Sequence, residues 1–217
     1  MVDLAALQAC AFLDSDGATE HDLAEVAARS QRNAQANPNA LRKRDLTAED
    51  VLKEPVTHYP LRDADIFPIT DGSAAVMLAA GDLARKVSKR PAWIRGIEHR
   101  IEAHGLGVRD LAHSESTRAA GTAAGVADGK VDVAELHAQF SHEELILAEA
   151  LGLDATKTRI NPSGGALAAN AVMSAGLVRI GEVARRITNG EADRGVAHAT
   201  SGPCLQQNMV VVLEGDS

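Results

Sequence analysis

The segment from residue 161 to residue 176 constrains the chain most, because a loop of small residues leads there directly into an apolar helical pattern. The loop begins with Asn161, Pro162 and Ser163 and continues with Gly164 and Gly165. The two glycines have no Cβ, so a ligand or a second chain segment can come close to the backbone at this point. Two interpretations stay open from the residues alone: a structural turn, and a substrate-binding loop that uses all of these residues except the proline.

Composition limits the possible classes of protein. The chain has 217 residues, 45% of them hydrophobic, which is enough for a full core in one domain, or in one domain and a smaller appendage. The formal net charge of −8 argues against a nucleic-acid binder, since neutralising phosphates requires a clustered excess of lysine and arginine. Cys10 and Cys204 are too few for a disulfide framework, which favours a reducing, cytoplasmic setting. No apolar run reaches the roughly 18 residues of a membrane span, so we expect none.

Helix signals dominate the first part of the chain. Thr19 precedes acidic residues and then apolar residues at helical spacing, which predicts a helix of about three turns. Thr47 begins a second, shorter pattern of the same kind. Between them, residues 42–44 form the most basic cluster of the chain. This cluster is either a solvated surface or a site of phosphate contact.

From residue 66 onward, apolar runs alternate with helical patterns. The run over 66–79 has the small residues of a buried strand that packs closely against a helix, and 80–87 can form that helix. Further strands are expected over 91–97, 130–137, 195–199 and 208–214, and further helices over 114–127, 143–151 and 176–188. This alternation indicates a layered α/β domain.

Four blocks in order resemble the thiolase family, and they cover nearly the whole chain. Thr70–Leu78 looks like the Asn/Thr-Asp-Gly-Ala-Ala-Ala-Val segment that closes the first thiolase half, and Thr19–Asp50 is similar to the latter part of the loop domain. Val133–Ser141 corresponds to the Asn-Glu-Ala-Phe block, in the His-Asp-Cys-Phe variant of sterol-carrier-protein-type thiolases. Asn161–Gly176 resembles the Asn-x-x-Gly-Gly block that leads to Gly-His-Pro, and Leu213 and Glu214 end the last strand.

The resemblance implies a thiolase-like layered α/β fold, of which the chain holds one complete C-terminal half of the βαβαβ type. In such a half, a five-stranded sheet is covered by helices. Residues 1–65 would be a helical remnant of the loop domain, residues 66–90 the end of the N-terminal half, and residues 91–217 the C-terminal thiolase domain.

The resemblance also implies chemistry on acyl coenzyme A thioesters, with coenzyme A as substrate and no bound cofactor. In the family a cysteine takes the acyl group, because a thiolate attacks a carbonyl readily once its pKa is lowered. Neither Cys10 nor Cys204 stands at the family's position for that nucleophile. We therefore expect a partner to supply it.

The same resemblance assigns the candidate catalytic residues. His137 stands where the family has an oxyanion-stabilising Asn or His; a partly buried histidine that bonds the backbone at a strand end is the alternative. Asn170 replaces the histidine of Gly-His-Pro, and because an amide cannot be a general base, its expected role is to orient the thioester. The family's second cysteine falls by counting near residues 200–202, and an insertion or deletion would bring Cys204 there as an acid. His198 lies close to this proposed site in the sequence and is a candidate substrate-binding residue.

No metal site is expected, because His99, His104 and His113 come without cysteines or a His-x-x-x-His pair. Three functions remain open. The chain could supply the second half of an acyltransferase or lyase assembly, could be an inactive thiolase-like protein that binds acyl coenzyme A or lipid, or could be a truncated copy of a full-length enzyme. A stable monomer is not expected: a homo-oligomer such as a dimer, or a hetero-partner carrying the first thiolase half, would cover the apolar surface.

Overall fold

A five-stranded mixed sheet forms the centre of the computed structural model, which describes residues 1–15 and 17–216. The strand order is β3-β7-β6-β4-β5, with β4 parallel to β5 and β6, and β7 antiparallel to β3 and β6. The strands are β3 (Trp93–Ile101), β4 (Val133–Glu135), β5 (Arg159–Ile160), β6 (Arg194–Ser201) and β7 (Gln207–Glu214). The expected layered α/β class is confirmed.

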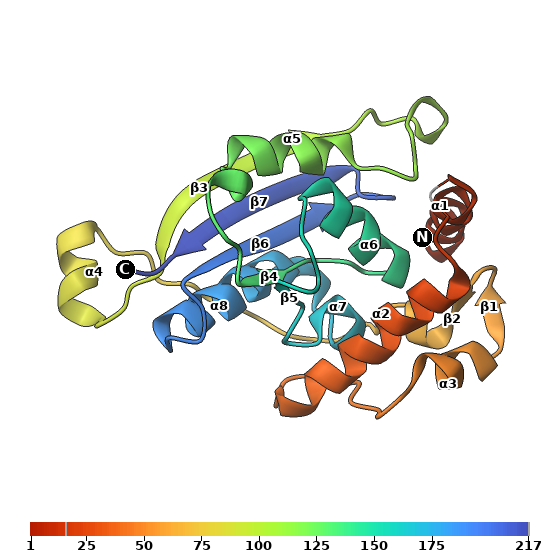
Figure 1. Ribbon diagram of the computed structural model, residues 1–217, viewed down its shortest axis with the longest axis horizontal. Helices are drawn as coiled ribbons and strands as arrows, with labels where there is room; N and C mark the ends of the chain where they lie inside the picture. The colour runs from red at the N-terminus through yellow and green to blue at the C-terminus, as the bar shows by residue number, and fades with distance from the viewer. Residues whose placement is uncertain (16, 217) are drawn as a thin grey trace.

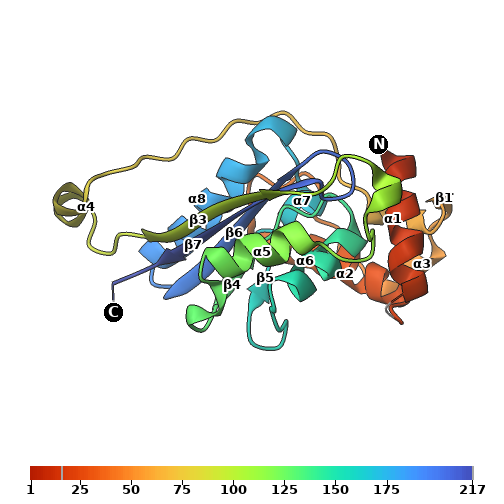
Figure 2. The same cartoon turned by 90° about the horizontal axis from the view of Figure 1, so that it is seen from above.

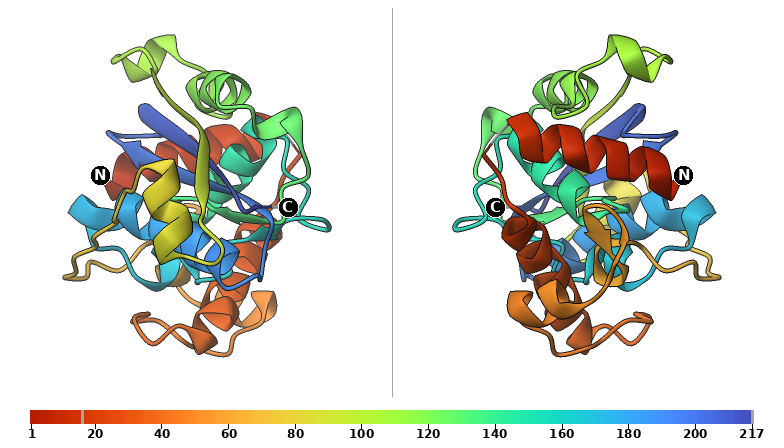
Figure 3. Two further views of the ribbon diagram at one scale, coloured as in Figure 1. Left: turned by 90° about the vertical axis from the view of Figure 1, so that its left-hand side faces the viewer. Right: turned by 90° about the vertical axis from the view of Figure 1, so that its right-hand side faces the viewer.

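Helices cover both faces of this sheet (Figures 1 and 3). On one face, α5 (Glu115–Ala123) packs on β3 and β7 and also contacts α6 (Ser141–Ala150). On the other face, α8 (Ala175–Thr188) packs on β4, β6 and β7. Two short helical segments, α7 (Gly165–Ala168) and the 3-10 turn Val172–Ser174, lead into α8.

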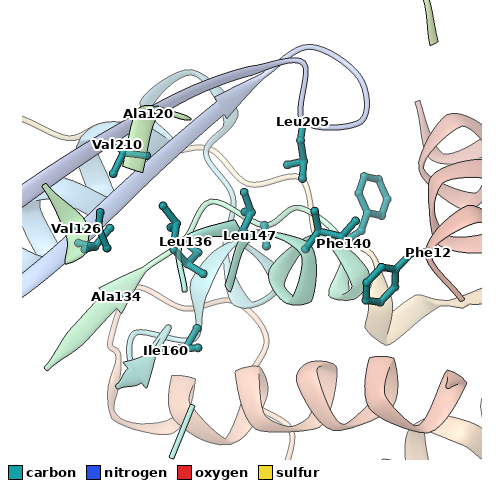
Figure 4. Close-up of a cluster of buried hydrophobic side chains, with 14 of the residues drawn as sticks. Phe12, Ala120, Val126, Ala134, Leu136, Phe140, Leu147, Ile160, Leu205 and Val210 are labelled. Carbon is teal, nitrogen blue, oxygen red and sulfur yellow. The ribbon is translucent and has the colours of Figure 1, made fainter. Parts of the chain in front are cut away.

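The largest core cluster fills the space between the sheet and the α5–α6 layer (Figure 4). Leu136 and Leu147 are completely buried in it, together with Val210 of β7. Burial of each such leucine side chain contributes about 1.5–3 kcal/mol. Phe12 and Leu23 from the N-terminal helices belong to the same cluster, so residues before 65 share a core with the sheet.

Three helices and a two-stranded hairpin make up the N-terminal part: α1 (Val2–Ser15), α2 (Glu20–Asn33), α3 (Ala48–Lys53), β1 (Val56–His58) and β2 (Leu61–Arg62). The helices predicted after Thr19 and Thr47 are confirmed as α2 and α3. Each threonine accepts from the backbone N–H three residues later, and an aspartate there accepts from the threonine N–H. The sequence interpretation missed α1 and the hairpin.

The basic cluster at residues 42–44 is bound largely to the chain itself. Arg42 donates to the carbonyl oxygens of Asp63 and Ile66, at 2.8 and 2.7 Å. Arg44 donates to Glu54 at 2.8 Å and to Gln31 at 3.1 Å. These contacts support a structural role for both arginines in place of phosphate contact.

The buried strand expected over residues 66–79 is wrong. Isolated bridges join Ile66 to Phe140 and Ile69 to Asn170, and residues 70–80 then form no strand. Met77 is 95% exposed. A buried strand needs neighbours for its N–H and C=O groups, and among residues 1–15 and 17–216 no strand pairs with this one. Figure 2 shows the segment as a bare trace that reaches α4 (Gly81–Val87), away from the sheet.

Several boundaries differ from the expected ones. The strand expected over 130–137 is shorter, the one expected over 91–97 continues to Ile101, and β5 was missed. The helix expected over 114–127 ends at Ala123, because Gly125 adopts a left-handed φ of 78° that an α-helix cannot continue. Within the described part of the chain, no helix has both the length and the apolarity needed to cross a membrane.

Candidate functional site

The candidate site lies at the carboxyl edge of the parallel strands. Because β4, β5 and β6 run in the same direction, the residues at their carboxyl ends meet at one edge of the sheet. These residues are His137 after β4, Asn161 after β5 and Thr200 near the end of β6. A cavity of about 560 Å³ opens there, with His137 and Thr200 in its wall. The sequence-predicted His137 is thus placed at a cavity.

His137 and Asn170 are brought together at this edge. His137 Nε2 lies 3.2 Å from Asn170 Oδ1, and the backbone N–H of Thr200 donates to His137 Nδ1 at 3.4 Å. Since Nδ1 accepts, Nε2 carries the ring proton and donates it to the amide oxygen. The contact with Thr200 therefore fixes both the histidine tautomer and the orientation of the Asn170 amide.

His137 is neutral in this setting. Its side chain is buried, and burial together with the charge of Arg179 lowers the pKa of His137 to about 4, against the opposing bonds to Asn170 and Thr200. An imidazole with that pKa carries no charge at neutral pH. With both ring nitrogens already bonded, its clearest role is to hold Asn170 in place.

The Asn170 amide nitrogen is an unused donor. The residue is 1% exposed, and its Nδ2 has no hydrogen-bond partner among the described residues. Leaving a buried donor unpaired costs roughly 1–3 kcal/mol. A ligand oxygen that accepted this hydrogen bond would remove the penalty. Asn170 is not itself among the residues that line the cavity; it bonds His137, which is.

The loop over 161–165 is bonded to its own protein. Asn161 Oδ1 accepts from Leu136 N–H at 2.7 Å, and its Nδ2 donates to Glu144 at 2.6 Å. Ser163 donates to Glu135 through both its backbone N–H and its hydroxyl, at 3.0 and 2.6 Å. The Gly165 N–H donates to Ser163 Oγ at 3.2 Å. These bonds support the structural-turn interpretation and leave the substrate-binding role of the loop a prediction.

The close packing around Gly164 explains why this position has no side chain. It has φ of 93°, and a Cβ there would lie 2.6 Å from the Ala34 Cβ and 2.7 Å from the Ala168 Cβ. Ser30 at the same place donates its hydroxyl to the Gly164 carbonyl oxygen. The glycine therefore admits a second chain segment, the carboxyl end of α2, and no ligand contact is needed to explain it.

A buried ion pair that the sequence interpretation missed supports this loop. Glu135 of β4 is completely buried and lies 3.0 Å from Arg179 of α8, and both side chains contact Ser163. The signal was present: an acid inside an apolar strand needs a cationic or hydrogen-bonding partner. The pair therefore connects β4, the loop over 161–165 and α8.

Cys204 is not among the residues that line the cavity. Its thiol donates to the Leu4 carbonyl oxygen at 3.3 Å, and burial, with a contribution from the Glu143 carboxyl group, raises the pKa of the Cys204 thiol to about 11. A thiol in that setting is poorly suited to proton transfer at neutral pH. The acid role of Cys204 stays a prediction without support from this geometry.

His198 belongs to the core side of β6. It is 1% exposed, its Nε2 lies 3.0 Å from Asn208 Oδ1, and it does not line the cavity. Burial lowers the pKa of His198 to about 3. A substrate-binding role for His198 is a prediction that these contacts do not support.

The three histidines considered as surface residues do not form a metal site with one another. His104 bonds Gln206, and His113 bonds Asp110. Over residues 1–15 and 17–216, no group of three or more His, Cys, Asp or Glu side chains is arranged to hold a metal ion.

Known proteins resemble the chain in sequence. No known protein-family model matches it. An acetyl-CoA acetyltransferase of Methanothermobacter thermautotrophicus is 30% identical over 210 residues, which take in 86% of this chain and 54% of that protein. Benzoylsuccinyl-CoA thiolase subunit BbsB of Thauera aromatica is 29% identical over 153 residues, or 68% of this chain and 40% of that one. The chain thus spans about half, or less, of the length of these relatives.

Solved structures resemble it in fold. An Ltp2-ChsH2(DUF35) aldolase superposes with a TM-score of 0.83 at 20% identity, over 98% of this chain and 63% of that one. Human mitochondrial 3-ketoacyl-CoA thiolase gives a TM-score of 0.72 at 18% identity, over 98% and 59%. In both sequence and fold, the chain is therefore thiolase-like over the part of these proteins that it spans, and the resemblance inferred from its motifs is confirmed.

Proposed function

We propose that this chain provides the carbonyl-recognition part of a thiolase-like site that acts on acyl coenzyme A thioesters. The carrying observation is the His137–Asn170 pair, in which a neutral histidine of fixed tautomer holds a buried amide whose Nδ2 has no acceptor among the described residues. A thioester carbonyl oxygen would accept that hydrogen bond. The bond would strengthen as negative charge develops on the oxygen during acyl transfer or carbon–carbon bond cleavage.

The nucleophile would come from a partner polypeptide. Cys204 is bonded to Leu4 and has a raised pKa, and Cys10 lies in α1 with its thiol 3.7 Å from the Tyr59 carbonyl oxygen. Neither thiol lines the cavity beside His137. An assembly that contributes a low-pKa cysteine would supply the covalent step that this geometry does not support.

Exposed apolar side chains also support an assembled state. Ile69, Met77 and Leu78 lie on the extended segment before α4, and Ile97 and Ile101 lie on β3, all more than half exposed. Large apolar side chains gathered on an exposed surface mark interaction sites in soluble proteins. The aldolase with the similar fold is named for two components, Ltp2 and ChsH2(DUF35), which supports a hetero-partner and admits a lyase as well as an acyltransferase.

The experiment compares two ligands that differ only at the carbonyl. Calorimetry measures the binding of octanoyl-CoA and of S-octyl-CoA, the thioether in which a methylene replaces the carbonyl. We expect the thioester to bind about tenfold more tightly, the value of one satisfied buried donor. Asn170→Ala should abolish that preference, and His137→Ala should reduce it.

His99→Ala is the control, because His99 is an exposed histidine on β3. It should leave the preference unchanged. A preference that survives Asn170→Ala would remove Asn170 from the carbonyl site.

An inactive acyl-CoA-binding protein is the second candidate. It is favoured by the replacement of a histidine base by Asn170, since an amide cannot take a proton. The two candidates share the binding step and differ only in turnover. A purified assembly that binds octanoyl-CoA but never transfers or cleaves it would favour the binding protein.

A further inference from the structure

The cavity beside His137 is apolar away from its polar end. Leu4 of α1 lies on one side, and Val172 and Met173 of the turn before α8 lie in the wall as well, together with Pro203 of the loop between β6 and β7. Met173 is 99% exposed and Val172 46% exposed. An apolar ligand that covered these side chains would remove apolar surface from water, which favours binding.

The polar groups of the cavity are concentrated at one place. His137 and Gln139 come from the segment after β4, and Thr200 and Ser201 come from the end of β6. Asn170 does not line the cavity but bonds His137, which does. A thioester carbonyl placed beside this pair would leave the apolar side chains to contact the acyl chain. The volume of about 560 Å³ falls within the roughly 300–1,000 Å³ of ordinary small-molecule sites.

No lysine or arginine side chain is among the residues that line this cavity. His137 itself is neutral, since burial lowers its pKa to about 4. A carboxylate placed against Leu4, Val172 and Met173 would lose part of its water without gaining a cationic side chain, which is unfavourable.

We propose that this cavity selects thioesters whose acyl group is an uncharged apolar chain longer than acetyl and disfavours acyl groups that end in a carboxylate. This proposal rests on the function proposed above and adds its substrate class. It separates the chain from the relative named for benzoylsuccinyl-CoA, whose acyl group carries a free carboxylate.

The test uses three thioesters on the whole chain: acetyl-CoA, octanoyl-CoA, and suberyl-CoA, which has eight acyl carbons but ends in a carboxylate. Calorimetry should show octanoyl-CoA binding at least tenfold more tightly than either of the others, because each buried methylene strengthens binding roughly fourfold. Met1 lines the cavity, so its α-amino group could bind the suberyl carboxylate. The titrations are therefore repeated on a chain extended at Met1 by a short neutral segment, which moves that group away.

Two matched variants locate the selectivity. Met173→Asp should weaken octanoyl-CoA binding about tenfold and leave acetyl-CoA binding within twofold. Met77→Asp, at a methionine that is also almost fully exposed but does not line the cavity, should change neither.

The outcomes are distinct. Equal binding of octanoyl-CoA and suberyl-CoA, or of octanoyl-CoA and acetyl-CoA, overturns the selectivity while the thioester site stands. Equal weakening by Met173→Asp and Met77→Asp overturns the assignment of the selectivity to this cavity. If none of the three thioesters binds, the proposed function fails and this inference fails with it.

Discussion

His137 and Asn170 are 33 positions apart in the sequence, and their side chains meet with Nε2 3.2 Å from Oδ1. The thiolase resemblance puts an asparagine or histidine at the first of these positions and a histidine at the second. In this chain Asn170 replaces that histidine base, and His137, whose tautomer is fixed by the Thr200 N–H, donates to the Asn170 amide oxygen. An amide at position 170 cannot abstract a proton, and its use in carbonyl recognition is the function proposed above.

Replacing His137 by Ala should lower turnover of an acyl-CoA thioester by the active assembly about 10²-fold or more, because Asn170 would lose the group that orients it. Far-UV circular dichroism and the urea midpoint should stay close to those of the wild type. An unchanged rate in a folded variant would take His137 out of the site; His21→Ala, at an exposed histidine of α2, serves as the control.

Replacing Arg179 by Met should lower the free energy of unfolding by about 3–5 kcal/mol, because it leaves the Glu135 carboxylate buried without its partner. The double variant Glu135→Gln with Arg179→Met should recover part of that loss. Urea denaturation of both single variants, Arg179→Met and Glu135→Gln, and of the double variant measures these effects. Additive losses in the double variant would show that the two side chains do not act as a pair.

Replacing Gly164 by Ala should destabilise the fold by about 3 kcal/mol or more, through the left-handed backbone and through overlap with Ala34 and Ala168. Gly152→Ala is the control, since Gly152 also has a positive φ, 64°, but open space where its Cβ would be. It should cost only about 1–2 kcal/mol. Thermal or urea unfolding of both variants decides; equal losses would contradict the close packing at Gly164.

The buried His142 should make stability depend on pH. Burial lowers its pKa to about 3, so below about pH 6.5 the unfolded chain gains a proton that the folded chain does not. The wild type therefore loses up to about 1.4 kcal/mol per pH unit through this group as the pH falls, and His142→Gln does not. Urea denaturation at pH 7.5 and pH 5 measures the free energy of unfolding of both proteins. The value for the variant minus that for the wild type should be larger at pH 5 than at pH 7.5. A difference that does not change with pH would contradict a buried neutral histidine at position 142.

Local signals predicted the local structure. The caps at Thr19 and Thr47 and the apolar periodicity of residues 176–188 gave helices close to those observed, because they depend on neighbouring residues alone. The strand predicted over 66–79 was wrong because an apolar run indicates burial, whereas strand formation also needs a neighbouring strand. No strand among the described residues pairs with residues 70–79.

Of the catalytic residues predicted for the site, two meet in the fold, and the roles assigned to all of them stay predictions. The resemblance singled out His137 and Asn170, which do meet. The tautomer depends on the Thr200 N–H, which the fold brings from β6, and the role of Gly164 depends on α2, more than a hundred residues earlier. Such long-range contacts leave no pattern in a single sequence.

The most direct test is the intact mass of the chain and of everything that co-purifies with it from its native host, before and after addition of octanoyl-CoA. The account predicts that a partner polypeptide gains one octanoyl group on a cysteine and that the 217-residue chain gains none. If the chain elutes alone and no acyl mass is gained, or if the acyl group lands on Cys10 or Cys204, the proposed division of the site between two polypeptides is contradicted.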